Sequence, residues 1–253
     1  MLLTLALAVL MGVTLGVMGG GGSILTVPIL LHAAGLEAKP AIATSLFVVG
    51  IASAAALVPR AFAGNVRWRT GLVFGAASMA GALGGGWLAR FVPGPLLLAG
   101  FAAVMLATGV AMWRGPSAGR PAGAAHPGRH PVRIAVDGVV VGAVTGIVGA
   151  GGGFLIVPAL VLLGGLPMRE AVGTSLLVIA LNSAAGFAGY LSHVAVDFGL
   201  ALAVSAAALA GSVPGALASR RVSPDRLRRG FAGFVLAMAV WMLWRQAGEL
   251  GVF

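Results

Sequence analysis

The sequence contains no cysteine and very few charged residues. Charged residues make up 9% of the 253 positions, and only 6 are acidic, whereas an ordinary soluble domain carries about 25%. A soluble globule could not cover its surface with so few charges, so a soluble enzyme is excluded. The lack of cysteine also excludes disulfides, thiol catalysis and cysteine-ligated metals.

Catalytic and cofactor motifs are also missing. There is no cluster of histidine and glutamate with metal-ligand spacing, no H-E-x-x-H sequence and no Gly-Lys-Ser/Thr after a glycine-rich stretch. We therefore predict no catalytic residue, no metal, no cofactor and no enzymatic activity. The residues Met1 to Met11 carry no basic residue, so they are read as a membrane element and not as a removed signal peptide.

Hydrophobic residues are abundant. They form 59% of the chain, the mean hydropathy is +1.05, and several apolar runs approach the twenty residues that a helix needs to cross a bilayer. Most of the chain is thus expected to lie in lipid. The net charge of +10 comes from basic residues at the ends of these runs, which is typical of topology signals and predicts no nucleic-acid partner.

An internal repeat relates the two halves of the chain. The sequence GVMGGGGSILTVPIL at 16–30 matches GIVGAGGGFLIVPAL at 146–160, and Thr44-Ser45-Leu46 matches Thr174-Ser175-Leu176 at the same shift of 130 positions. The register holds without a gap over about 100 residues, which indicates a tandem duplication.

We therefore predict two membrane repeats, residues 1–113 and 134–253, separated by a linker at 114–133. The linker is rich in proline, glycine and arginine and has no apolar periodicity, so it is expected outside the membrane. Each repeat has one long first segment and three spans of ordinary length. The segments are Leu2–Ala34, Ala41–Val58, Thr70–Ala89 and Leu96–Trp113, then Ile134–Gly164, Ala171–Leu191, Phe198–Ser219 and Leu227–Trp244.

The first segment of each repeat is too long for one simple span. Its thirty-odd residues would form a helix of about 50 Å, against a hydrocarbon core of about 30 Å. It also contains helix breakers: Gly19–Gly22 and Pro28 in the first half, Gly149–Gly153 and Pro158 in the second. We predict a broken pair that enters the membrane and returns.

The basic residues test this prediction. If the first segment crossed fully, Lys and Arg would divide eight against eight between the two sides. If it returns, they divide 13 against 3, which obeys the positive-inside rule and places the linker in the cytoplasm and both termini outside. The prediction is an all-α integral membrane protein of two inverted repeats, the usual architecture of secondary transporters.

The paired helix breaks are the predicted binding site. A break exposes N–H groups at the start of the next half-helix, where the helix dipole favours an anion. The residues concerned are Gly19, Gly20, Gly21, Gly22 and Ser23, with Gly149, Gly151, Gly152 and Gly153. The alternative is that these glycines only permit close helix packing, as the pairs Gly12/Gly16, Gly81/Gly85 and Gly211/Gly215 do.

Five further polar residues are candidates for the same site. The hydroxyls of Thr44, Ser45, Thr174 and Ser175 face a ligand, or they cap helices or bond to their own backbone. Asn182 lies within an apolar span, where it contacts a ligand or joins two helices. Proton coupling stays open, with Asp137 and His32 as candidates. Small-residue faces suit a homodimer and suit packing within one chain equally well.

The doubled motif resembles a known family. GVMGGGGSILTVP followed by AIATSLF, and GIVGAGGGFLIVP followed by AVGTSLL, are similar to the TauE/SafE family of sulfite exporters, and the resemblance covers all of the chain except the linker. It implies a small bacterial inner-membrane carrier that exports sulfite or a related sulfonate. The residues point to an anion, and only the resemblance points to sulfur.

Three functions therefore compete. The first is a secondary transporter whose partners are a small anion and membrane lipid. The second is a passive anion channel, or an uptake permease for another small anion. The third is a scaffold that transports nothing, in which the glycines serve packing alone.

Overall fold

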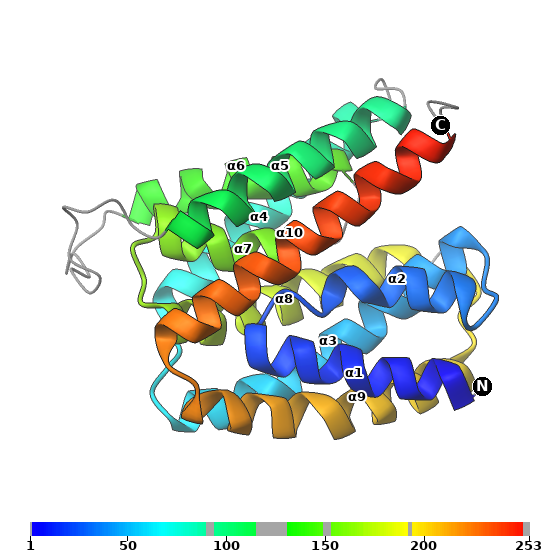
Figure 1. The fold of residues 1–253 in the computed structure, drawn as a ribbon, viewed down its shortest axis with the longest axis horizontal. Helices are drawn as coiled ribbons and strands as arrows, with labels where there is room; N and C mark the ends of the chain where they lie inside the picture. The colour runs from blue at the N-terminus through cyan, green and yellow to red at the C-terminus, as the bar shows by residue number, and fades with distance from the viewer. Residues whose placement is uncertain (1, 90–93, 115–130, 149–152, 192–193, 250–253) are drawn as a thin grey trace.

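Apolar runs of the predicted length form helices along the chain (Figure 1). The computed structural model describes residues 2–89, 94–114, 131–148, 153–191 and 194–249, and within these ranges it contains helices and no strand. The helices are α1 (Leu2–Met18), α2 (Ser23–His32), α3 (Ala38–Phe62), α4 (Trp68–Ala89), α5 (Gly94–Arg114), α6 (Pro131–Val148), α7 (Gly153–Pro158), α8 (Met168–Leu191), α9 (Phe198–Ala218) and α10 (Pro224–Glu249), with a π-helical turn η1 (Ala159–Leu163) and a 3₁₀ turn η2 (Ser219–Arg221).

Three of the described helices are long and apolar enough to cross a membrane: Lys39–Phe62, Met168–Leu191 and Phe198–Ala218. Large apolar side chains are exposed on the outer surface, among them Leu2, Phe62 and Leu83. Water would oppose such exposure, whereas lipid favours it. The all-helical membrane class predicted from composition is therefore confirmed.

The first segment folds as a hairpin of two helices. α1 ends at Met18 and α2 begins at Ser23, so the predicted glycine breakers Gly19–Gly22 lie between them. Pro28, which was also predicted to break the helix, lies inside α2. The Thr4 hydroxyl, near the start of α1, donates to the carbonyl of Ala33, directly after α2, at 2.9 Å. The outer ends of α1 and α2 consequently lie together, near the N-terminus in Figure 1.

Corresponding helices of the two halves begin 130 positions apart. This holds for α2 and α7, α3 and α8, α4 and α9, and α5 and α10. The turns agree as well, because Gly35 and Gly165 both adopt a positive φ, +70° and +67°. A side chain is disfavoured in that conformation, so glycine at both positions fits the turn before α3 and α8.

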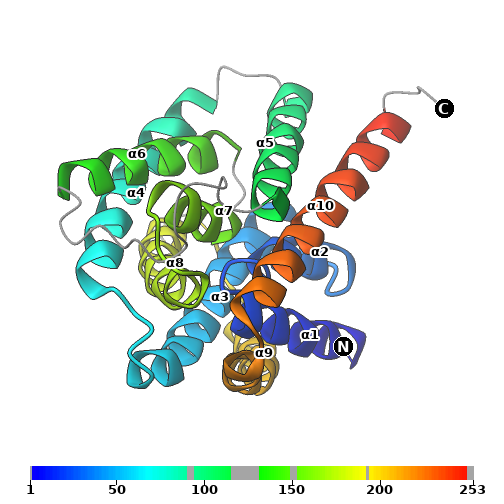
Figure 2. The ribbon, with the colours of Figure 1, turned by 60° about the vertical axis from the view of Figure 1, so that its left-hand side comes forward.

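Two parallel helix pairs flank a central pair. α1 packs on α9, α4 packs on α6, and α3 and α8 lie between them (Figure 2). Glycines set the spacing of the flanking pairs. A Cβ on Gly12 would collide with the Ala208 carbonyl of α9, and one on Gly142 would collide with the Ser78 carbonyl of α4. The predicted small-residue pairs Gly12/Gly16, Gly81/Gly85 and Gly211/Gly215 all lie in these contacts within the chain.

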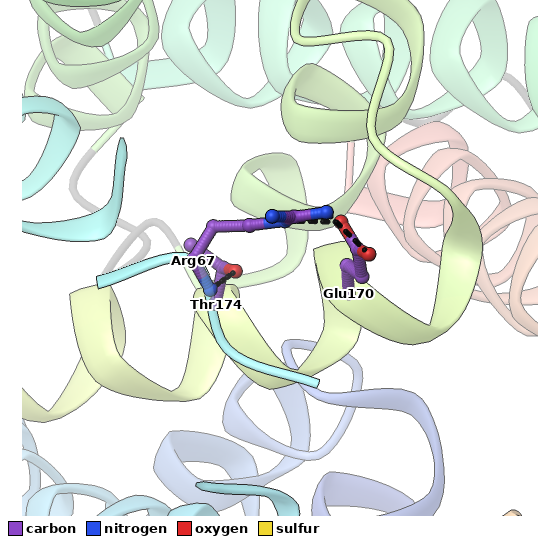
Figure 3. Close-up of polar contacts among 3 residues, drawn as sticks. All are labelled: Arg67, Glu170 and Thr174. Carbon is purple, nitrogen blue, oxygen red and sulfur yellow. Dashed lines mark hydrogen bonds and ion pairs between the residues drawn. The ribbon is translucent and has the colours of Figure 1, made fainter. Parts of the chain in front are cut away.

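The central helices α3 and α8 run antiparallel. Arg67, just after α3, contacts Glu170 and Thr174 at the start of α8 (Figure 3), while Lys39 at the start of α3 and Val194 beyond α8 line one cavity. The molecule therefore has two ends. The "Lys39 end" holds the start of α3 and the end of α8, and the "Arg60 end" holds the end of α3 and the start of α8.

Candidate functional site

The break between α1 and α2 is a buried turn of glycines. Gly19 continues the last turn of α1, since its N–H donates to the Leu15 carbonyl at 2.7 Å, and it adopts a φ of +78°. Gly19, Gly20, Gly21 and Gly22 are all buried. Gly22 caps α2 without a side-chain hydrogen bond, which leaves the first turn of α2 to be satisfied by other groups.

The two halves meet at this turn. A Cβ on Gly20 would collide with the carbonyl of Gly153, the first residue of α7, and a Cβ on Gly153 would collide with the Ser23 hydroxyl. A Cβ on Gly19 would lie 2.6 Å from the Ser175 hydroxyl of α8. Five predicted site residues from both halves thus converge, and their backbones approach too closely for any side chain at Gly20.

The predicted hydroxyls are buried, except for the partly buried Ser23, and several form hydrogen bonds. Ser23 donates to the Gly20 carbonyl at 2.7 Å, and Ser175 donates to the Val172 carbonyl at 2.8 Å. Thr174 instead accepts the backbone N–H of Arg67 at 3.0 Å (Figure 3). Ser23 and Ser175 therefore bond to their local backbone, one of the roles considered for these hydroxyls, whereas Thr174 joins α8 to the segment before α4. Their counterparts on α3, Thr44 and Ser45, are also buried, with 1% and 6% of their surface exposed.

Other predicted residues lie apart from this convergence. The nearest atoms to a Cβ on Gly21 belong to the ring of Phe234 in α10, at 3.4 Å, and a Cβ on Gly22 would meet Met11 and Leu15 of α1. Gly149, Gly151 and Gly152 lie outside the described residues. The predicted site is thus drawn together around Gly20, Ser23 and Gly153, and not around all of the glycines.

Asn182 lies in the wall of a separate cavity. Its side-chain amide donates to the Ser78 hydroxyl of α4 at 3.0 Å, so it joins two helices, which was one of its two predicted roles, and it also lines a cavity. The cavity encloses about 670 Å³ between the α3–α8 and α4–α6 pairs. Its polar lining residues are Lys39, Ser78, Thr145, Asn182 and Tyr190, and Ile156 of α7 lines it next to the second break.

The cavity extends to the Lys39 end, where its lining residues Lys39 and Gly189 are exposed. Its volume falls within the range of about 300–1,000 Å³ that is common for small-molecule sites. Sequence reasoning did not single out Ser78, Thr145 or Tyr190, because a hydroxyl in an apolar helix does not indicate which residue it will contact. Only the packing of α4 against α8, and of α6 against α4, brings these groups together.

Arg60 is a further residue that sequence reasoning missed, since it was counted only as a topology signal. Its side chain is 2% exposed. Nη2 donates to the carbonyls of Gly16 and Val17 at 2.9 and 3.2 Å, and to the Ser219 hydroxyl at 2.6 Å. Arg60 therefore donates hydrogen bonds to carbonyls at the C-terminal end of α1. A helix leaves its last carbonyls unpaired, and its dipole favours a positive charge beside them.

Arg67 forms an ion pair with Glu170 at the same end (Figure 3). Nε and Nη2 of Arg67 donate to the two carboxylate oxygens at 2.7 and 2.9 Å. The hydrogen bond to Glu170, and then the charge of this carboxylate, raise the pKa of Arg67. Among the described residues there is no group of histidine, aspartate and glutamate that could hold a metal ion.

A multi-pass helical membrane protein is the class that these observations define. The sulfite exporter TauE/SafE family model matches residues 4–242. The chain therefore belongs to the TauE/SafE family, as its doubled motif predicted.

Relatives in distant organisms match over nearly the whole chain. A probable membrane transporter protein of Xylella fastidiosa (strain 9a5c) is 32% identical over 259 residues, covering 99% of this chain and 97% of the relative. The probable membrane transporter protein MJ0441 of Methanocaldococcus jannaschii is 27% identical and covers 96% of each chain. YdhB of Bacillus subtilis, also named a probable membrane transporter protein, is 25% identical over 82% of this chain and 85% of its own. No solved structure matches this chain.

Proposed function

We propose that this protein is a secondary carrier that exports sulfite or a related small sulfonate, bound where the two glycine-rich turns meet. The observation that carries the proposal is the convergence of Gly20 and Ser23 from one half with Gly153 from the other. The first turn of α2 offers backbone N–H groups and the positive end of a helix dipole, which favour an anion. Sulfite as the cargo rests on the family description.

An inverted repeat supports this assignment. Ser23 and Gly153 are 130 positions apart and contact each other, as residues beside a twofold axis do. The antiparallel course of α3 and α8, which also correspond, has the same explanation. In secondary transporters, substrate sites lie at the interface of such repeats, on broken helices.

The basic residues orient the molecule in the cytoplasmic membrane of a bacterium. With the α1–α2 hairpin returning to its own side, 13 of the 16 Lys and Arg residues belong to the side of the Arg60 end. The positive-inside rule then places that end and the linker in the cytoplasm. The Lys39 end and both termini face outward, and the described cavity opens to the outside.

The experiment is flux of radiolabelled sulfite in proteoliposomes, with and without a pH gradient, in competition with unlabelled sulfonates. We expect saturable flux with counterflow, which a passive channel would not show. Acceleration by the gradient would add proton coupling. The absence of flux above empty liposomes, with protein shown to be folded, would remove sulfite as the cargo.

A glycine pair locates the site within the same assay. Gly20→Ala pushes a methyl group into the Gly153 carbonyl, so we expect loss of most flux. Gly84→Ala on α4 is the matched control, because a Cβ there meets nothing within 4 Å. Equal flux in both variants would place the binding site elsewhere.

A further inference from the structure

The cavity at the Lys39 end has a sequence counterpart at the Arg60 end, and that counterpart is closed. Each lining residue has a counterpart 130 positions away in the other half. Tyr190 corresponds to Arg60, Ala82 to Ser212, and Thr145 to Leu15. All three counterparts are at most 2% exposed. The same shift thus relates an open space between α4–α6 and α8 to a packed core between α1–α9 and α3.

Arg60 connects the helices that surround the closed counterpart. One nitrogen, Nη2, joins α3 to the end of α1, through Gly16 and Val17, and to Ser219 directly after α9. Ser219 in turn donates to the Ala216 carbonyl of α9 at 2.7 Å. At the Lys39 end the corresponding residue is Tyr190, a partly buried residue in the cavity wall.

Three hydroxyl groups of α3 and α9 support a second state. Ser53 of α3, and Ser205 and Ser212 of α9, have buried Oγ atoms with no hydrogen-bond partner among the described residues. Burying a hydroxyl without a partner costs free energy, and such groups need an explanation in a native structure. An interface that separates and fills with water during transport supplies the missing partners.

We propose that this structure is the carrier's outward-open state, and that Arg60 is the residue that closes the cytoplasmic path by holding α1 and α9 onto α3. The proposal rests on the transport function above. The α1–α9 pair, fixed by its glycine contacts, moves away from α3 when Arg60 releases it, and the α4–α6 pair closes on α8 in the same transition. Alternating access in inverted repeats proceeds by such movements around a fixed site.

Two single cysteines test the proposal, since the natural chain has none. Ala82→Cys reports on the open cavity, and Ser212→Cys reports on its closed counterpart. A membrane-impermeant maleimide is applied from each side of oriented vesicles. We expect Ala82→Cys to react from outside, and Ser212→Cys to react at least about tenfold more slowly from the cytoplasmic side. Equal rates would overturn the assignment of the open and closed ends.

Arg60→Gln is then added to each reporter. Removing the closing contacts shifts the population toward the cytoplasm-open state. Ser212→Cys should therefore react about tenfold faster, and Ala82→Cys should react more slowly. A residue that only supports the fold would instead raise both rates, and that result would overturn the role of Arg60. Arg69→Gln, an exposed arginine in the first turn of α4 at the same end, is the control and should change neither rate.

A milder variant covers the case in which Arg60→Gln does not fold. Ser219→Ala removes one of the acceptors of Arg60, and we expect a smaller shift of both reporters in the same opposed directions. No opposed shift in folded Ser219→Ala protein would count against the proposal. Labelling requires no transport, so opposed rates without sulfite flux would overturn the proposed cargo and leave the closing role of Arg60 intact.

Discussion

The two halves have the same order of helices, but the spaces between these helices differ at the two ends of the molecule. Their helices begin at positions 130 apart, and glycine brings α1 onto α9 as it brings α6 onto α4. The Lys39 end of the molecule nevertheless has a cavity of about 670 Å³ that both halves line, whereas the matching positions at the Arg60 end are packed around Arg60. Similar helices therefore do not fix whether a path is open. The polar contacts at the ends of the helices decide it.

The difference also separates two kinds of glycine. Those in the α1–α9 and α4–α6 contacts have counterparts in both halves and serve packing. Gly19 and Gly20, between α1 and α2, instead lie against the predicted site residues Ser175 and Gly153. The first kind holds each moving unit together, and the second kind lies where the proposed anion binds.

The largest effect on stability is expected from Arg60→Ala, compared with Tyr190→Ala. Arg60→Ala removes three charge-assisted hydrogen bonds and leaves buried acceptors behind, which should lower the free energy of unfolding by about 3 kcal/mol. Tyr190 borders the cavity, so its loss should cost less than about 1 kcal/mol. Thermal unfolding in detergent measures both. Similar losses would show that the two halves are equally packed.

A second comparison contrasts neighbouring glycines. Gly20→Ala forces a methyl group against the Gly153 backbone, and we expect a loss of about 2 kcal/mol. A Cβ on Gly21 lies at ordinary contact distance from Phe234, so Gly21→Ala should stay within about 0.5 kcal/mol. The same unfolding assay applies. If Gly21→Ala lowers the free energy of unfolding more than Gly20→Ala does, the close contact of Gly20 with Gly153 is contradicted.

The symmetry of the flanking pairs gives a third prediction. Gly12→Ala and Gly142→Ala place methyl groups against equivalent carbonyls, and each should cost about 1–2 kcal/mol. Gly84→Ala has open space and should gain up to about 1 kcal/mol from helix propensity. A large loss in one flanking pair and none in the other would contradict equivalent packing.

The smallest effect is expected at the ion pair of Arg67 and Glu170. The arginine side chain is 53% exposed, so Glu170→Gln should cost no more than about 1 kcal/mol. Because the pKa of Arg67 is raised, its contribution is complete below the ordinary pKa of an arginine, and is lost only as the pH rises above it. Unfolding at several pH values between 5 and 9 should show no trend from this arginine. A trend that disappears in Arg67→Gln would contradict this account.

Sequence reasoning predicted the helical class and the family, and its glycine breakers lie between the end of α1 at Met18 and the start of α2 at Ser23. These features follow from local signals: apolar runs, helix breakers and a doubled motif. It did not find the contact of Ser78 with Asn182 or the role of Arg60. Those depend on which helices become neighbours, and a serine or an arginine carries no local signal that names its partner across 104 or 159 positions.

The pairing of α1 with α9 has a consequence for biogenesis. α9 begins at Phe198, 180 residues after α1 ends at Met18, so at about 5–20 residues per second the glycine face of α1 waits roughly 10–40 s for its partner. α6, in the second half, finds its partner α4 already made. The first half therefore enters the bilayer before the packing partner of α1 has been synthesised. Its packing is completed only when the second half is made, so the two halves fold as one unit.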